Sequence, residues 1–500
     1  MVPKAHQLSL AALTALVVGS ILDAGIFSVP ATFGRAAGAL GATIAWVIAG
    51  VGMLMLALLF QKLSWRKPTL KAGIYDYVRE GFGEYPAFFA VFGFWASCCV
   101  GSVSYFLLIK STFSLVFPAL GQGNTPLAVL LSSAGIWLVH FLVLRGIRQA
   151  TVINTVATVA KVLIVIIFIV IVAGAFEPEM FQLNFWGGPL PPPPADVDTL
   201  DYYGRTGHAA WLMRAQGPEG LVEQVRRTML VAAYVFIGVE GASIYARYAR
   251  RRKDVGLATL MGFFIVLLLF ILVTLISYGV MERQSLAALR QPSLAGILEY
   301  LGRTRGGLFV RAGLVVTVLG AYLAWVLLAM EVLYSAAKRG GMPRFMYSMS
   351  RNQVPHLALL ATSGLVQFFL LCTVFSDYAY GFALELTSAL SRMPYLFVAG
   401  FALKLALSGE TYARNSTLRV RDAIIACVAI LYLLVVLWAG GIKYVLLSAL
   451  VYAPGSVLYV MARREQGVLR LPPWEKMLLV AVWCAAIAAV AGLYSGTITI

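Results

Sequence analysis

Two glycine-rich stretches decide the fold: GSILDAGIF at residues 19–27 and FIGVEGAS at residues 236–243. Each lies inside an apolar run and carries two glycines and one carboxylate, Asp23 in the first stretch and Glu240 in the second. Backbone groups freed where a membrane helix breaks must line a cavity or be buried in protein. Glycine alone often serves only close helix packing. Two matching interruptions, each with an acid, favour broken helices that form a binding site near the middle of the membrane.

The surrounding sequence is that of a membrane protein. Of its 500 residues, 60% are hydrophobic and only 12% are charged, whereas soluble domains average about 25% charged residues. We expect an all-α polytopic protein, because a spanning helix needs about 20 apolar residues. Thirteen runs qualify, and twelve is the alternative because the last three have uncertain boundaries: 9–31, 38–60, 86–117, 125–144, 151–175, 228–247, 256–280, 308–336, 356–376, 379–403, 421–439, 441–461 and 475–496.

The formal net charge is +17, and the distribution of the basic residues indicates how the chain is oriented in the membrane. The chain has no dense basic arm and no soluble domain to present one, which excludes nucleic acid as a partner. Most lysines and arginines fall on one side of the predicted membrane if the N-terminus is cytoplasmic, and short loops with this bias set orientation. The basic cluster at residues 250–253 is either an anchor of this kind or a site for anionic lipid.

The two interrupted segments each open a block of five predicted helices, residues 1–175 and 228–405. This arrangement predicts an inverted five-plus-five repeat, followed by peripheral helices over 406–500. Residues 176–227 form a long outer connection with four consecutive prolines, which is either a tolerated insertion or a binding loop. Residues 281–307 predict a short amphipathic cap.

Charged residues deep in a membrane are costly and are functional hypotheses by default. Five qualify, and they are Asp23, Lys161, Glu240, Glu331 and Arg392. Lys161 lies midway along its helix, where it serves either as a proton carrier or in a static ion pair with Glu331 or Asp23. Arg392 either extends to the membrane surface or pairs with a carboxylate, and its depth favours pairing.

The sequence contains no pattern for catalysis. Its four histidines stand at termini or loop edges, and no metal-ligand, nucleophile or phosphate-binding constellation is present. We therefore expect no enzyme activity, no metal and no cofactor.

Several motifs resemble the basic amino acid/polyamine antiporters of the amino acid–polyamine–organocation superfamily, most closely the bacterial arginine/ornithine antiporters. The match covers most of residues 8–405, and the stretch at 236–243 is its most specific part. The other shared motifs are HFLVLRGI at 140–147, INTV at 153–156, VAKV at 159–162, DVG at 254–256, YSAAK at 334–338 and GMP at 341–343.

This resemblance implies residue roles. The backbone at Ala24 and Gly25 would meet a substrate carboxylate, and carbonyls near Tyr234 and Ile237 would meet its amino group. A cation–π contact would then place Trp325 over the substrate side chain. The remaining implied residues are Tyr395 beside Trp325, Ser102 and Phe94 at the far end of the pocket, Lys161 in place of a coupling sodium ion and Glu240 in gating.

The family also implies a bacterial inner-membrane protein that exchanges a cationic amino acid or amine; oligomers are compatible with it. The sequence departs from the family at Asp23, which replaces a glycine, and at Arg392, which replaces an apolar residue. Ala24 and Ser102 are smaller departures. Asp23 puts a negative charge where a substrate carboxylate would bind, which favours a decarboxylated amine or a permanent pairing of Asp23 with Lys161 or Arg392. The alternatives are a proton-coupled symporter with Lys161 as the proton site and a non-transporting sensor.

Overall fold

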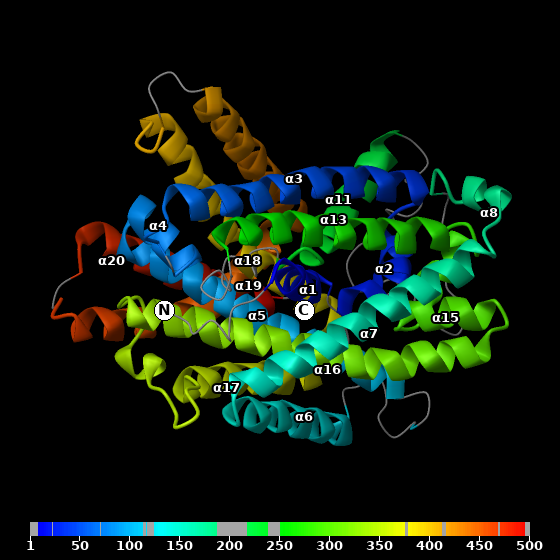
Figure 1. Ribbon diagram of the computed structural model, residues 1–500, viewed down its shortest axis with the longest axis horizontal. Helices are drawn as coiled ribbons and strands as arrows, with labels where there is room; N and C mark the ends of the chain where they lie inside the picture. The colour runs from blue at the N-terminus through cyan, green and yellow to red at the C-terminus, as the bar shows by residue number, and fades with distance from the viewer. Residues whose placement is uncertain are drawn as a thin grey trace.

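The computed structural model describes residues 9–22, 24–70, 72–113, 117, 125–187, 218–238, 251–375, 379–412, 417–468 and 471–495. In this part of the chain, long helices run roughly along one direction and shorter helices cover the two ends of the bundle (Figure 1). The predicted all-α class is confirmed.

Nine helices of the described residues are long and apolar enough to cross a membrane. A tenth apolar helix, α17 (His356–Cys372), is shorter. The nine are α3 (Ala39–Arg66), α5 (Glu84–Phe113), α6 (Pro126–Leu144), α7 (Ile147–Ala173), α13 (Arg252–Ser277), α16 (Thr304–Lys338), α18 (Ala379–Ser408), α19 (Thr417–Glu465) and α20 (Pro473–Tyr494).

Helix α19 contains two of the predicted spans, 421–439 and 441–461. Its 49 residues would measure about 74 Å if straight, more than twice the hydrocarbon thickness of a bilayer. Gly441 interrupts it with φ of 71°, a left-handed conformation that glycine adopts without steric cost. The two predicted segments therefore meet at this glycine.

The first predicted span is broken, as its sequence indicates. Helix α1 (Leu10–Ile21) ends before Asp23, which lies outside the described residues. The chain resumes as a single 3-10 turn, η2 (Ala24–Phe27), and continues as α2 (Val29–Ala36). The predicted discontinuity at residues 22–25 is confirmed.

The sixth predicted span also stops short. Helix α11 (Pro218–Tyr234) passes into a turn at 235–238, where Gly238 has φ of 106°. The helix ends before the predicted break at 237–241, and Glu240 lies outside the described residues.

Helix α11 also begins ten residues before the predicted start at 228, within the segment expected to be a loop. A hydropathy pattern misses this beginning because it is amphipathic. Arg226 and Arg227 bind Glu223 along the helix, while Gln224 is buried.

Short helices cover one end of the bundle. These are α8 (Pro178–Leu183), α14 (Arg283–Ala288) and α15 (Ser293–Tyr300), which lie together with α2 (Figure 1). The last two confirm the expected cap between 281 and 307. At the opposite end lies α4 (Ile74–Phe82), which precedes α5. The apolar pattern does not predict α4.

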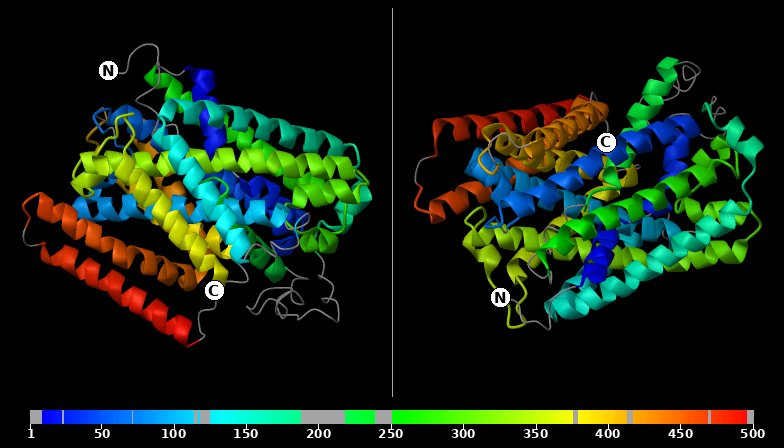
Figure 2. Two further views of the ribbon diagram at one scale, coloured as in Figure 1. Left: turned by 90° about the horizontal axis from the view of Figure 1, so that it is seen from below. Right: turned by 45° about the horizontal axis from the view of Figure 1, so that its top comes forward.

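The broken helices lie inside the bundle. Helix α1 is seen end-on near the centre of Figure 1 and packs against α13 and α7. Helix α5 packs against both α16 and α18. Helices α19 and α20 lie together along one side of the molecule (Figure 2). The two breaks are therefore surrounded by protein, which the unpaired backbone of a broken membrane helix requires.

Candidate functional site

The break in the first span is held by Lys161 of α7. Its side chain is 1% exposed and its ammonium donates a hydrogen bond to the carbonyl of Leu22, the residue that follows α1. A helix ends with carbonyls that lack backbone partners and with a partial negative charge, so a cation at this point is doubly favourable. Lys161 thus replaces the hydrogen bond that the broken helix lacks.

The 3-10 turn beyond the break has its own side-chain support. The amide of Ser28 and its hydroxyl both donate to the Gly25 carbonyl, at 2.9 and 2.8 Å. The hydroxyl of Tyr380 lies 2.8 Å from Ser28 Oγ, and Ser293 Oγ donates to Phe27 O at 3.1 Å. Residues of α18 and α15 therefore hold the turn in place.

The two interrupted segments contact one another directly. Ser20 Oγ of α1 donates to Gly238 O at 3.0 Å. A Cβ atom on Gly238 would lie 2.5 Å from the Ser20 carbonyl oxygen, closer than real Cβ contacts permit. Glycine at 238 is thus required twice, by its positive φ and by the close approach of the backbone at Ser20.

Trp325 of α16 lies against α5 near this crossing. Its ring makes an edge contact with Tyr105, with centroids 5.7 Å apart. A Cβ on Gly101 would be 2.7 Å from Trp325 Cζ3, so only glycine leaves room for the indole. The indole nitrogen is buried without a hydrogen-bond partner among the described residues.

Ser104 lies one turn along α5 from Gly101. It contacts Tyr234 at the end of α11, and their hydroxyl oxygens are 3.3 Å apart. Tyr105, Gly101 and Ser104 were not predicted as site residues. Their spacing of three and four along one helix is the signal that sequence reasoning could have used.

The predicted far end of the pocket lies apart from Trp325. Phe94 contacts the ring of Tyr395 with centroids 6.4 Å apart, about two helical turns along α5 from Gly101. The hydroxyl of Ser102 donates to the Cys98 carbonyl of its own helix at 2.7 Å. Phe94 and Tyr395 therefore meet one another at a different level of α5 from the residue that meets Trp325.

The remaining predicted charges are dispersed. Glu331 is buried on α16, one and a half turns beyond Trp325, and accepts a hydrogen bond from Ser335 at 3.3 Å. Arg392 of α18 lines a pocket beside α19. Pairing of Lys161 with Glu331 or Asp23 stays a prediction, as does pairing of Arg392 with Asp23.

Every predicted site residue that the structure describes is buried. The exposed fractions of Ala24, Tyr234, Ile237, Trp325 and Tyr395 are all 2% or less. A substrate at this position would therefore be enclosed on all sides. Among the described residues, no group of histidine, cysteine, aspartate or glutamate side chains could hold a metal ion.

Replacement of Trp325 tests whether it recognises a cation. We expect Trp325→Leu to weaken binding of a cationic ligand by about 0.5–2 kcal/mol, because leucine has no π face. Trp325→Phe and Trp325→Tyr should lose less, and they serve as controls for the change in volume. Binding is measured by thermal shift of the purified variants against arginine and agmatine; equal affinity of the wild type and Trp325→Leu would contradict a cation–π role.

The sequence model of amino acid permeases matches residues 8–462, so the chain belongs to the amino acid permease family. Within it, the chain is 41% identical to the arginine/ornithine antiporter of Pseudomonas aeruginosa, with 99% of each chain covered. The resemblance to basic amino acid antiporters is thereby confirmed.

Other relatives differ in the names of their substrates. The arginine/agmatine antiporter of Chlamydia pneumoniae is 34% identical over 93% of this chain and 91% of its own. The L-lysine transport protein of Corynebacterium glutamicum is 34% identical over 99% and 97%. A Na⁺-coupled sialic acid symporter, solved in a substrate-bound outward-open state, shares the fold at 12% identity with a TM-score of 0.52 and covers 88% of this chain and 90% of its own.

Proposed function

We propose that the protein exchanges a cationic amino acid, of the arginine, ornithine or lysine type, or a related amine across the bacterial inner membrane. The observation that carries the proposal is the contact between the two interrupted segments, where Ser20 meets Gly238, together with the hydrogen bond from Lys161 of α7 to Leu22 at the break. A buried break of this kind offers backbone donors and acceptors to a zwitterionic ligand. The named substrates of the relatives supply its charge class.

The proposal includes features inferred from the family. The core is an inverted repeat of two five-helix blocks, with the N-terminus in the cytoplasm. Lys161 takes the place of a coupling sodium ion, since its ammonium holds the end of α1. Glu240 takes part in gating or in the response to protons. Neither role needs a cofactor.

Counterflow tests this function. Purified protein is reconstituted into liposomes that contain ornithine, agmatine, lysine or no substrate, and uptake of labelled arginine is measured. Exchange predicts uptake only into preloaded liposomes. Uptake into empty liposomes that follows an imposed pH gradient would support the alternative, a proton-coupled symporter with Lys161 as its proton site.

Asp23 is the residue in which the chain departs most from its family, and we propose that it sets the choice between amino acids and amines. A carboxylate where a substrate carboxylate would lie repels an amino acid and attracts a decarboxylated amine. Asp23→Gly should therefore shift preference towards arginine and away from agmatine. The ratio of arginine to agmatine uptake is compared in wild type, Asp23→Gly and Asp23→Asn.

The asparagine variant separates charge from size. If charge is the cause, Asp23→Asn should shift the ratio in the same direction as Asp23→Gly. An unchanged ratio in both variants would mean that Asp23 is structural.

A further inference from the structure

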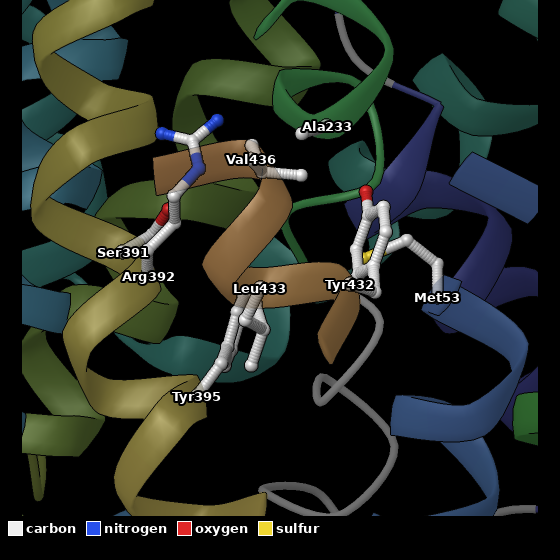
Figure 3. Close-up of a pocket in the computed structure, with 8 residues that line it drawn as sticks. All are labelled: Met53, Ala233, Ser391, Arg392, Tyr395, Tyr432, Leu433 and Val436. Atoms are coloured by element: carbon white, nitrogen blue, oxygen red, sulfur yellow. The ribbon is translucent and has the colours of Figure 1, made fainter. Parts of the chain in front are cut away.

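A pocket with polar residues in its lining lies between α3, α11, α18 and α19, next to the end of α11 at Ala233. Figure 3 shows Arg392 and Tyr432 reaching into it from α18 and α19, with the guanidinium and the hydroxyl on the side near Ala233 and Val436. Its lining consists of Met53, Ala233, Ser391, Arg392, Tyr395, Tyr432, Leu433 and Val436.

Two buried side chains of this pocket carry donor atoms that lack hydrogen-bond partners within the described part of the chain. Arg392 is 4% exposed, and its Nε and one terminal nitrogen, Nη2, are both unpartnered. Tyr432 is 5% exposed, and its hydroxyl is also unpartnered. Buried polar groups are almost always hydrogen-bonded, and a buried cation without partners is especially costly.

The unpartnered atoms are arranged for one kind of ligand. Nε and Nη2 form one edge of the guanidinium, and their N–H groups point in the same direction. The two N–H groups of this edge can donate to the two oxygens of a carboxylate, or both can donate to one small anion. The Tyr432 hydroxyl is a third donor at the border of the same pocket, and Figure 3 shows Val436 between it and the guanidinium.

The tyrosine is held in place by close packing. A Cβ atom on Gly52 of α3 would lie 2.1 Å from Tyr432 Cγ, so the ring rests directly on the backbone of α3. Because the ring is wedged against this backbone, the side chain cannot swing about its Cα–Cβ bond, and its hydroxyl stays directed into the pocket. The donor geometry is thus built by the packing of α3 against α19.

The local charge favours an anion. Glu385 lies seven residues before Arg392, on the same face of α18. The positive charges of both Arg392 and Lys443 act on the Glu385 carboxylate. Lys443 follows the Gly441 kink of α19. Arg392 therefore shares the single negative charge of Glu385 with Lys443, which leaves its own positive charge only partly compensated.

We propose that this pocket binds one small monovalent anion between Arg392 and Tyr432. The pocket has space for a single small group, and its walls are otherwise apolar apart from Ser391 and the Tyr395 side chain. A single halide ion would accept hydrogen bonds from these donors and balance the charge. Since the site joins α18 to α3 and α19, its occupancy stabilises the folded bundle.

An anion titration tests this site. Wild-type protein is purified in chloride-free gluconate buffer, and its thermal unfolding is followed as chloride, bromide or formate replaces gluconate at constant ionic strength. A ligand of the folded state raises the melting temperature in a saturable manner. We expect saturation with at least one of these anions. The halide and formate arms tell a monatomic ligand from a carboxylate.

Three variants locate the response. Tyr432→Phe removes one hydroxyl and should raise the half-saturating concentration about tenfold, the effect of one hydrogen bond to a charged group. Arg392→Met should abolish the response. Tyr444→Phe, a partly buried tyrosine of α19 outside the pocket lining, should behave as the wild type.

The proposal fails if the wild type shows no saturable response, or if Tyr432→Phe and Arg392→Met respond as the wild type does. It also fails if only Glu385→Gln protein responds to anions, because Glu385 would then neutralise Arg392 itself. None of these readings depends on transport.

Discussion

Replacement of Lys161 by methionine is expected to abolish most exchange activity. Methionine keeps the length and apolar stem of the side chain but removes its charge and donors. The Leu22 carbonyl, buried at the end of α1, would lose its hydrogen bond from Lys161. An unsatisfied buried acceptor costs about 1–3 kcal/mol, and the negative end of the half-helix would lose its cation as well.

We therefore expect uptake into preloaded liposomes to fall by tenfold or more, together with a lower melting temperature. The matched control is Lys110→Met on α5. Lys110 is also buried, at 3% exposed, but its ammonium has no hydrogen-bond partner among the described residues. Removing it should leave the melting temperature unchanged or raise it, because an unpaired buried charge is costly.

The two variants together separate a specific role from a general effect of removing a buried lysine. If Lys161→Met is as stable and active as the wild type, the hydrogen bond to Leu22 is not what holds the break. If its activity falls while its stability does not, the role of Lys161 lies in the transport cycle. In that case, uptake should also lose its dependence on pH if Lys161 carries the proton.

Substitution of Gly238 by alanine should have a comparably large effect through the backbone. The residue has φ of 106°, and the added methyl group would lie 2.5 Å from the Ser20 carbonyl oxygen. The strained backbone alone costs about 1–3 kcal/mol, and the clash would push α1 away from the end of α11. We expect a lower yield of folded protein, a lower melting temperature and little or no exchange.

Gly364→Ala is the control for this change. Gly364 lies within α17, and a Cβ there would meet no atom within 4 Å. Alanine is the better helix former by about 1 kcal/mol, so this variant should be unchanged or more stable. Equal stability of Gly238→Ala and Gly364→Ala would show that the crossing of the two breaks tolerates a side chain.

Much of the architecture follows from the sequence alone. Apolar runs of about 20 residues predict the spanning helices, because a bilayer has a fixed thickness and leaves no backbone polar group unsatisfied. Glycines beside a carboxylate predict where the first span breaks, and the structure confirms the break at residues 22–25. Family motifs then predict the charge class of the substrate, which local sequence physics does not determine.

Other features required the tertiary structure. The amphipathic start of α11 and the whole of α4 escaped prediction because their polar residues are satisfied by local pairs and by contacts at the ends of the bundle. A search for long apolar runs does not detect an amphipathic helix such as these.

The partners of the buried charges were decided only by the fold. Five intramembrane charges predict that partners exist, but the sequence does not give the direction in which a side chain leaves its helix. In the structure, Lys161 reaches a backbone carbonyl, and Arg392 faces α19 and Tyr432. The hydrophobic pattern of a membrane helix indicates that most of its faces are apolar, but it does not identify the helix that each face contacts. Which neighbour each side faces depends on packing between segments that lie far apart in the chain.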